Sequence, residues 1–354
     1  MSKILYGVSG EGSGHSSRAS LIAAHLQNQG HDVKIASYDR GYRNLQDHFD
    51  VVEIAGLTIV SEDNQVSKLK TITANLAKIP SGTRSLKLLR QTVEEFAPDL
   101  VITDFEPSTA YLASHYGLPL ITLDNQHRMR YMQYQMPPSL RQDALIAETI
   151  IRAMVPTPWV SLITTFHHSP LKNSRSFLFP PILRQSVLDL SVSESDTILV
   201  YATSGFDSLL ETLQTFSRET FVVYGYDKNE ISKNLHFRPF SKEGFLADLA
   251  QCKAVIATAG FTLISEALHL GKPYLAFPMQ GQFEQHLNAF MLEQNGYGAQ
   301  CQTPDAKHIA AFLYELPRYR ATLEHYPRAG NAAITEKLDE LLAEDRRLLK
   351  SFAR

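Results

Sequence analysis

The stretch from Thr258 to Phe290 constrains the fold of this chain more than any other. The apolar run Ala254–Ala257 comes directly before it and predicts a buried parallel strand. The backbone can then turn sharply into a helix that begins near Phe261, because the three residues between are small: Thr258, Ala259 and Gly260. The first turn of this helix contains no Lys or Arg, so an anion there would be bound by free backbone N–H groups. The pattern therefore predicts a phosphate site at a strand–turn–helix junction.

Polar residues continue the same unit. Glu266 lies about one and a half turns inside the helix, where a carboxylate can accept hydrogen bonds from hydroxyl groups such as those of a ribose. The sequence Gly271–Pro273 stops the helix and Tyr274–Phe277 predicts the next strand. A polar cluster follows that strand: Gln282, Glu284, Gln285 and Asn288. Ligands bind at strand tips in such sheets. The alternative is an ordinary βαβ crossover, in which Gly260 only closes a turn and Glu266 is solvated.

The combination resembles the donor-nucleotide signature of glycosyltransferases with the GT-B fold, in particular families 1 and 28. Family 28 includes the lipid-linked N-acetylglucosamine transferase of peptidoglycan synthesis. In those families a small-residue turn holds the diphosphate of a nucleotide sugar, a Glu holds the ribose, and an acidic or amide residue paired with Gln contacts the sugar. By this resemblance Thr258, Gly260 and Thr262 would hold the diphosphate, and Glu266 would hold the ribose. Glu284 and Gln285 would contact the sugar. Many family 1 enzymes have a His before paired glycines; Thr258 and Ala259 stand there instead, which favours family 28.

Composition bounds the alternatives. The chain has 354 residues, of which 44% are hydrophobic and 20% charged, and this predicts a soluble globular protein of two domains. The formal net charge of -3 and the lack of a motif that recognises DNA or RNA argue against nucleic acid as a partner. Only Cys252 and Cys301 occur, without zinc-type spacing, so we expect a reducing compartment and no metal. No apolar run reaches the roughly 18 residues that span a bilayer. A cytoplasmic protein, or one peripheral at the inner face of the membrane, is expected.

A glycine-rich loop, GEGSGHSS, follows a first predicted strand at Ile4–Val8. Its glycines permit close backbone approach, and Ser16 or Ser17 can cap the helix that follows. The loop is similar to the dinucleotide fingerprint of nicotinamide enzymes, with Asp39 near the end of the second strand in the place of the ribose ligand. A nicotinamide enzyme would leave the second glycine turn and Glu266 without a purpose.

The same loop more closely resembles the GxGxGH-like first loop of family 28, with His15 as its last residue. The resemblance places Gly12 and Gly14 on the acceptor side. The apolar run Pro98–Thr103 predicts a buried strand that ends at Asp104. Imidazole has a pKa near ~6.5 and accepts a proton when a carboxylate orients it. Asp104 looks like the Asp that supports the N-terminal His of family 1, so His15 and Asp104 are the predicted acid–base pair.

Alternatives to this pair stay open. His15 could be an ordinary loop residue, and Asp104 could cap the following turn. The bases that could compete with His15 are Glu106, Asp124 and His127. The last two belong to the run DNQHRMR, which follows a predicted strand at Leu118–Leu123 and forms an acceptor-side loop of undetermined role.

A basic segment covers residues 66–93, where six Lys or Arg side chains alternate with apolar residues and no Asp or Glu occurs. Such a segment can lie on anionic lipid. It can equally be the solvated face of a helix that packs on a core.

The second domain begins after the linker prolines Pro180 and Pro181. A predicted strand at Thr197–Ala202 leads into a loop that, by resemblance, also contacts the diphosphate: Thr203, Ser204 and Gly205. A short strand is expected at Phe237–Phe240. Relatives hold the nucleotide base after this strand, which makes Arg238 and Phe240 the candidates, although Phe240 could equally belong to the core.

These observations predict an α/β protein of the GT-B class, with two Rossmann-like parallel-sheet domains that face each other across a cleft. The predicted domains are 1–182 for the acceptor and 183–330 for the nucleotide sugar, with a helix at 331–354 that crosses back. The resemblance implies inverting, metal-independent transfer from a UDP-sugar, without a cofactor. The acceptor would be a glycan, a lipid carrier or a small molecule, and a role in a cell-envelope glycan is expected.

Two other functions fit part of the pattern. A sugar-nucleotide 2-epimerase shares the fold and the donor, but it carries an Arg and then a Thr-Glu-Arg run where this chain has Pro278, Met279 and Gln280. A binding protein that holds a sugar nucleotide without turnover is the other alternative.

Overall fold

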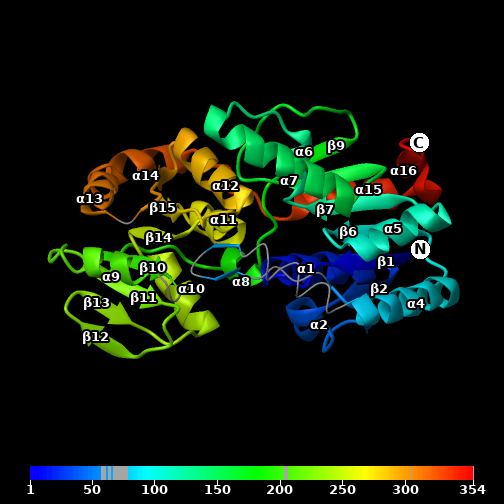
Figure 1. Cartoon of the computed structure of the whole chain (residues 1–354), viewed down its shortest axis with the longest axis horizontal. Helices are drawn as coiled ribbons and strands as arrows, with labels where there is room; N and C mark the ends of the chain where they lie inside the picture. Colours follow the sequence, from blue (N-terminus) through cyan, green and yellow to red (C-terminus); the bar gives the residue numbers. More distant parts are fainter. Residues whose placement is uncertain (57–60, 63–64, 67–78, 203–205, 304, 354) are drawn as a thin grey trace. The chain divides into compact units, whose positions relative to one another are not determined.

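The computed structural model describes residues 1–56, 61–62, 65–66, 79–202, 206–303 and 305–353 (Figure 1). The chain forms two compact units. The first consists of Met1–Val60, Ser67–Arg184 and Ala329–Arg354, and the second of Ser61–Val66 and Gln185–Arg328. A two-stranded antiparallel ribbon pairs β4 (Ser61–Glu62) with β5 (Gln65–Val66).

The first unit contains a parallel sheet of seven strands in the order β3-β2-β1-β6-β7-β8-β9. Its strands, in chain order, are β1 (Lys3–Val8), β2 (Asp32–Ser37), β3 (Val51–Glu53), β6 (Leu100–Asp104), β7 (Leu120–Asp124), β8 (Val160–Thr164) and β9 (Ser176–Phe179). Every residue of β6, β7 and β8 is buried. Helices cover both faces of such a sheet, which is why these strands are continuous apolar runs rather than alternating ones.

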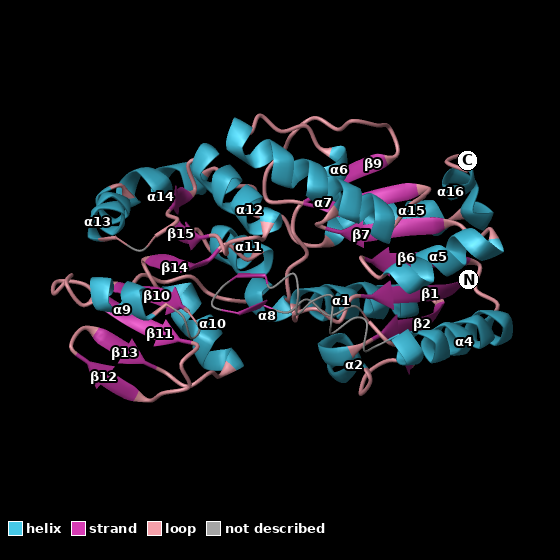
Figure 2. Cartoon of the chain, viewed as in Figure 1, coloured by secondary structure: helices cyan, strands magenta, loops and turns pink. Residues whose placement is uncertain are grey.

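The helices of the first unit pack on the two faces of this sheet (Figure 2). They are α1 (Gly14–Asn28), α2 (Asp39–Leu45), α4 (Ile79–Phe96), α5 (Pro107–Tyr116), α6 (His127–Tyr131), α7 (Arg141–Met154), α15 (Ala332–Leu342) and α16 (Arg347–Lys350), with 3-10 turns at Pro138–Leu140 and Glu344–Arg346. One core joins Ile4 and Ile102 to α1 and α15. The other joins Leu5 and Val101 to α4 and α5, because neighbouring residues of a strand point to opposite faces.

The second unit repeats this plan with another sheet of seven strands, in the order β12-β13-β11-β10-β14-β15-β16. Its strands are β10 (Thr197–Tyr201), β11 (Thr220–Tyr224), β12 (Glu230–Ser232), β13 (Leu235–Phe237), β14 (Ala254–Thr258), β15 (Tyr274–Phe277) and β16 (Gly298–Gln300). Its helices are α8 (Gln185–Leu188), α9 (Asp207–Leu213), α10 (Lys242–Gln251), α11 (Phe261–His269), α12 (Phe283–Gln294), α13 (Ala306–Tyr314) and α14 (Leu316–Glu324). Only β12 pairs antiparallel among the described strands of this sheet. The predicted α/β class with two parallel-sheet domains is confirmed.

Each sheet has one point at which the direction of strand addition reverses. In the first sheet the chain builds β1, β2 and β3 outward on one side and then continues with β6 on the other side of β1. In the second sheet the same reversal occurs between β10 and β14. Loops diverge there at the carboxyl ends of the strands, and α/β proteins bind their ligands in the resulting crevice.

Three local predictions were wrong. Helix α1 begins at Gly14 after Ser13, so Ser16 and Ser17 lie inside the helix and do not cap it. Strand β13 ends at Phe237, before Arg238, because its pairing with β11 ends there. The predicted helix at 331–354 is not continuous: Asp345 and Arg346 have φ angles of 55° and 61°, and this left-handed backbone interrupts it.

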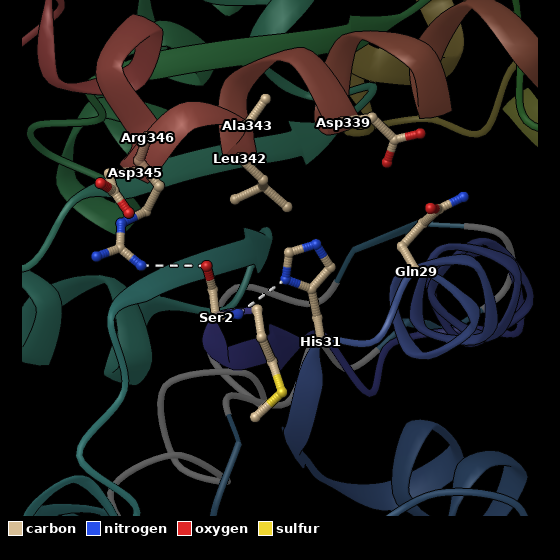
Figure 3. Close-up of a pocket in the computed structure, with 9 residues that line it drawn as sticks. Ser2, Gln29, His31, Asp339, Leu342, Ala343, Asp345 and Arg346 are labelled. Carbon is tan, nitrogen blue, oxygen red and sulfur yellow. Dashed lines mark hydrogen bonds between the residues drawn. The ribbon is translucent and has the colours of Figure 1, made fainter.

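The C-terminal segment packs against the first residues of the chain (Figure 3). Arg346 donates to Ser2 Oγ at 3.1 Å, and the Ser2 N–H donates to His31 Nδ1 at 3.1 Å. These residues line a pocket of about 330 Å³. Burial and the nearby terminal amine lower the pKa of His31. Because ligands bind at the carboxyl ends of the strands and Ser2 precedes β1, we interpret this pocket as part of the anchor of the C-terminal segment.

The described helices include none with both the length and the apolar character that crossing a bilayer requires.

Candidate functional site

His15 and Asp104 meet at the switch point of the first sheet. Asp104 is the last residue of β6 and is the register partner of Val8 at the end of β1. His15 lies in the first turn of α1, and its Nδ1 is 2.7 Å from Asp104 Oδ1. The carboxylate can only accept, so the contact requires a proton on Nδ1, although the donor Nη2 of Arg18 also lies 3.2 Å from this nitrogen. In the neutral imidazole the lone pair is then on Nε2, which is the form that acts as a general base.

Arg18 is a further member of this network, and our sequence analysis did not identify it. Its Nε donates to Asp104 Oδ2 at 2.9 Å and its Nη2 donates to Oδ1 at 2.7 Å. Its Nη1 donates to Asn125 Oδ1 at 3.2 Å. Arg18 follows His15 by three positions on α1, so both side chains face the same carboxylate. The spacing is a usable signal only once Asp104 is known to lie beside α1.

The bidentate contact sets the charge of Asp104. Burial by itself would raise the pKa of this carboxyl group, but the positive charge of Arg18, and then the contact with His15, outweigh burial and lower it. Asp104 is therefore ionised, and much of its charge is neutralised by Arg18. It orients the imidazole of His15 mainly through the hydrogen bond.

Glu106 has a structural role. Its carboxylate accepts from the backbone N–H groups of Ser108 at 2.8 Å and Thr109 at 2.7 Å, and from the Thr109 hydroxyl at 2.6 Å. It therefore caps the N-terminus of α5, and burial raises its pKa. A carboxylate with these three donors is poorly placed to serve as a base, so the structure does not favour Glu106 as the competitor of His15.

Asp124 and His127 form a second histidine–carboxylate pair. Asp124 accepts from the backbone N–H of His127 at 2.8 Å, and its other oxygen lies 2.7 Å from His127 Nδ1. Both side chains are 0% exposed, whereas His15 is 12% exposed. A base must reach its substrate, so His15 is the better candidate. On the loop predicted to face the acceptor, Gly12 is exposed with φ 73°, which glycine adopts without strain, and Gly14 opens α1.

In the second unit, Gly260 lies at the predicted phosphate turn, directly after β14 and before α11. Its φ of -69° is ordinary for any residue. A Cβ atom added there would meet no atom of the described residues within 4 Å. Neither backbone strain nor described packing therefore requires glycine. Gly260 is the N-cap of α11 and has no side chain with which to cap it, and Thr262 in the first turn is exposed. Helix N-termini of this kind can bind anions through backbone N–H groups.

Glu266 is 2% exposed, so the alternative in which this residue is solvated is wrong. It lies close enough to Tyr274 that its charge, after burial, raises the pKa of that phenol. The phenol donates to the Thr258 carbonyl at 2.6 Å, which connects β15 to the predicted phosphate turn. A carboxylate buried inside the unit is positioned by its surroundings rather than by water.

The polar cluster after β15 surrounds the start of α12. Gln285 accepts from the Met279 N–H at 3.0 Å and donates to Gln282 Oε1 at 2.8 Å, so its amide is held in one orientation. Glu284 is partly buried in the first turn of α12. Asn288 donates to the Ala259 carbonyl at 2.8 Å. The contact of Asn288 holds α12 against the predicted phosphate turn. The turn at Gly260 and the polar cluster at Glu284 and Gln285, which are the two parts of the predicted donor signature, therefore lie close together.

The candidates for base binding differ from one another. Arg238 forms an ion pair with Asp248 at 2.6 Å. Phe240 is 63% exposed with its ring 6.0 Å from that of Phe245, so it does not belong to the core. Thr203, Ser204 and Gly205 lie outside the described residues.

Of the basic segment, residues 67–78 also lie outside the described part of the chain. Residue 66 ends β5, and residues 79–93 belong to α4, which buries Leu89 and Val93 against the sheet and exposes Leu86 and Leu88.

Within the described residues, one group could supply three metal ligands: Cys301, Asp305 and His308. Asp305 accepts from the His308 N–H at 2.8 Å and lies 2.6 Å from its Nδ1. These contacts cap α13 and explain the arrangement of Asp305 and His308 without an ion.

His167, which follows β8, predicts a pH dependence of stability. Burial, and then the charge of Arg128, lowers its pKa to about 3. In the unfolded chain this histidine has a pKa of ~6.5 and binds a proton below that pH. In the folded chain it stays neutral over the same range. The free energy of unfolding should therefore fall by about 1.4 kcal/mol per pH unit as the pH drops below ~6.5. Urea unfolding at pH 7, 6 and 5 should show that the free energy of unfolding falls less steeply with pH in His167→Gln than in the wild type. The same slope in both proteins would contradict the role of His167.

Comparison with known proteins gives a consistent result. The model of glycosyl transferase family 1 matches residues 2–317. An uncharacterized glycosyltransferase of Methanosarcina acetivorans is 27% identical over 332 residues, covering 84% of each chain. One from Methanosarcina mazei is 26% identical over 332 residues, again covering 84% of each.

Solved structures show the same fold. The calicheamicin glycosyltransferase CalG4 aligns with a TM-score of 0.69 at 14% identity, covering 97% of this chain and 99% of that one. The Streptomyces glycosyltransferase SsfS6, complexed with thymidine diphosphate, aligns with a TM-score of 0.57 at 17% identity, covering 96% and 100%. With the family match over most of the sequence, these likenesses lead to one conclusion: the chain belongs to glycosyl transferase family 1 and has the GT-B fold.

Proposed function

We propose that this protein transfers a sugar from a nucleoside diphosphate sugar, most simply a UDP-sugar, to an acceptor hydroxyl, with inversion and without a metal ion. The observation that carries the proposal is the contact between His15 Nδ1 and Asp104 at the switch point of the first sheet, at 2.7 Å. A protein that only binds a sugar nucleotide has no use for a base prepared in this way. A 2-epimerase would also need a base, to remove the proton from C2 of the sugar, and it is separated from a transferase by its lack of an acceptor product.

In the proposed reaction, His15 Nε2 accepts the proton of the acceptor hydroxyl. The hydroxyl oxygen then forms a bond to the anomeric carbon while the bond from that carbon to the diphosphate oxygen breaks. The diphosphate leaves with the electron pair, and N–H groups at the start of α11 stabilise its charge. One displacement at the anomeric carbon inverts its configuration. Backbone dipoles supply the electrostatic stabilisation that a metal ion would otherwise provide.

The remaining donor contacts are proposed from their positions. Glu266 would accept from the ribose hydroxyls, and Glu284 and Gln285 would contact the sugar. Thr258 and Thr262, with Thr203, Ser204 and Gly205, would contact the diphosphate. Arg238 and exposed Phe240 would hold the base. SsfS6 was solved with thymidine diphosphate, so the choice between uracil and thymine is tested by competition of UDP, TDP and GDP in thermal-shift measurements.

Contact of the segment 66–93 with anionic lipid at the inner face of the membrane remains part of the proposal. Exposed Leu86 and Leu88 on α4 beside Arg84 and Lys87 support it. Sedimentation with anionic and with neutral vesicles tests it.

The central experiment incubates the protein with radiolabelled nucleotide sugars, with and without a lipid or glycan extract. Label in a new acceptor product supports the proposal. Conversion of the free donor sugar into its epimer would show an epimerase instead, and binding without either product would show a protein that only holds the donor.

Gly260→Ala separates ligand binding from folding. The added methyl group meets no described atom within 4 Å and the backbone φ is ordinary, so the melting temperature should change by less than about 2 °C. The methyl group would obstruct a diphosphate that approaches the backbone, so affinity for UDP should fall about tenfold or more. Calorimetric titration with UDP measures the affinity of the variant and of the wild type. Gly330→Ala, which also meets no described atom, is the matched control and should bind UDP normally; equal affinities in the two variants would refute the placement of the diphosphate.

A further inference from the structure

The first unit contains a larger pocket beside α6 and α7, with a volume of about 740 Å³. Sites for small molecules have volumes of roughly 300–1,000 Å³. Residues of α6, of the loop after it and of α7 line the pocket, among them Met129, Met132, Met136 and Leu145. We call it the methionine pocket, because three of the chain's seven methionines line it within eight consecutive residues.

Part of the wall of this pocket is fixed and the methionines are adaptable. The Lys172 N–H donates to the Tyr131 carbonyl at 2.7 Å, and the Gln133 N–H donates to the Pro170 carbonyl at 2.9 Å. These bonds hold the loop that carries Met132 against the segment after β8. Met129 is 8% exposed and Met132 0% exposed, so an apolar ligand contacts them only when these unbranched, polarizable side chains adjust to its shape. A flexible apolar chain is the ligand that such a lining suits.

One face of α7 forms another wall. Arg141, Ala144, Leu145 and Glu148 all line the pocket and are spaced i, i+3, i+4 and i+7, which places them on one side of the helix. Leu145 is 66% exposed although it is a large apolar residue. An apolar ligand in the pocket would cover it.

The charges around the pocket favour an acidic ligand. Glu148 lies 2.9 Å from Arg152 and 3.6 Å from Lys172, so its charge is compensated. Arg141 forms no ion pair with any residue that the structure describes. The pocket therefore presents one uncompensated cation beside an apolar surface.

The pocket is connected to the candidate catalytic network through a short piece of chain. Asn125 accepts from Arg18 at 3.2 Å, and α6, which carries Met129, begins two residues later. We propose that the methionine pocket binds the acceptor, and that the acceptor is an anionic amphiphile whose flexible apolar chain packs on the methionines while Arg141 binds its acidic group. The inference rests on the proposed function in so far as it calls this ligand the acceptor.

The test uses the full chain with ¹³C-labelled methionine methyl groups and dodecyl phosphate, below its micelle concentration, as the probe. The methyl signals of Met129, Met132 and Met136 should shift on titration, while those of Met279 and Met291 in the second unit should not. Seven methionines can be assigned one at a time by Met→Leu substitution. The absence of shifts in all three pocket methionines would overturn the proposal.

Matched variants separate the pocket from the surface around it. Leu145→Asp should weaken binding of dodecyl phosphate about tenfold or more, because a carboxylate would be desolvated and repel the probe. Ile150→Asp places the same charge on an exposed residue of α7 that does not line the pocket, at 52% exposure, and should bind within about twofold of the wild type. Equal losses would show that the outer face of α7, not the pocket, binds the probe, and would overturn the proposal.

The acidic group has its own control. Arg141→Ala should weaken dodecyl phosphate about tenfold and leave the uncharged dodecyl maltoside unchanged. Equal effects on both probes, or binding of inorganic phosphate alone as tightly as dodecyl phosphate, would contradict the pairing of chain and charge.

Failure of this inference is distinguishable from failure of the proposed function. If dodecyl phosphate binds but no labelled sugar reaches any acceptor, the pocket is a binding site and the transfer reaction is wrong. If sugar transfer occurs and dodecyl phosphate does not compete with the acceptor, the reaction stands and the acceptor lies elsewhere.

Discussion

His15→Asn should lower the rate of sugar transfer by about 10²–10⁴-fold, the contribution of a positioned general base. The amide has a similar size but cannot accept the proton of the acceptor hydroxyl at neutral pH. Affinity for UDP should stay within about twofold, because the predicted donor contacts belong to the second unit. Initial rates at saturating donor, together with calorimetric titration of UDP, measure the two quantities separately.

The chain offers a matched control for this variant. His25 lies on the same helix and its Nε2 is 2.9 Å from a carboxylate oxygen of Asp339, so His25→Asn also breaks a histidine–carboxylate contact of α1. It should retain nearly full activity. If His15→Asn keeps more than about half of the wild-type rate, or if both variants lose it equally, the base is another group, and Asp124 with His127 becomes the next pair to test.

Arg18→Met should lower the free energy of unfolding by about 3–5 kcal/mol, because it leaves the charge of Asp104 buried without its partner. Asp104 is 0% exposed and Arg18 is 6% exposed, so water cannot replace the guanidinium. Urea unfolding at pH 7 measures the loss. The double variant Arg18→Met with Asp104→Asn should recover much of it, since no charge is then left behind.

The pH dependence of this variant has a definite sign. Without Arg18, burial would raise the pKa of Asp104, and a group with a raised folded pKa loses its stabilising contribution as the pH rises through that pKa. The loss in free energy of unfolding caused by Arg18→Met should therefore be smaller at pH 5 than at pH 8. A deficit that does not vary with pH, or that the double variant does not reduce, would show that Arg18 acts by packing alone.

Local patterns predicted most of the second unit's central motif. The strand before Thr258, the helix start at Phe261 and the strand at Tyr274–Phe277 were all found where expected. Each depends on a few neighbouring residues: an apolar run, small residues at a turn, and a stop after the helix. The sequence predicted that Gly260 allows a sharp turn of the backbone, yet its φ angle of -69° is one that any residue adopts. The structure shows that the requirement for glycine there does not come from the described fold.

Two of the errors occur where distant residues decide. The break in the last helix at Asp345 and Arg346 coincides with the contacts of Arg346 to Ser2 and Asp99, at 3.1 Å each, and both partners are far away in the sequence. No local signal marks those partners. Arg18 was missed for the same reason, because its carboxylate partner is 86 positions away.

The sequence by itself determined the α/β class, the two glycine-containing turns and the resemblance to GT-B glycosyltransferases, since strands, turns and helix starts follow from short-range periodicity and backbone preference. Only the tertiary structure decided which side chains share a site. The order of parallel strands brings the ends of β1 and β6 together, and burial there replaces water by fixed partners. That is why the geometry of His15, Arg18 and Asp104, and the pocket formed by three methionines, could be established only from the folded chain.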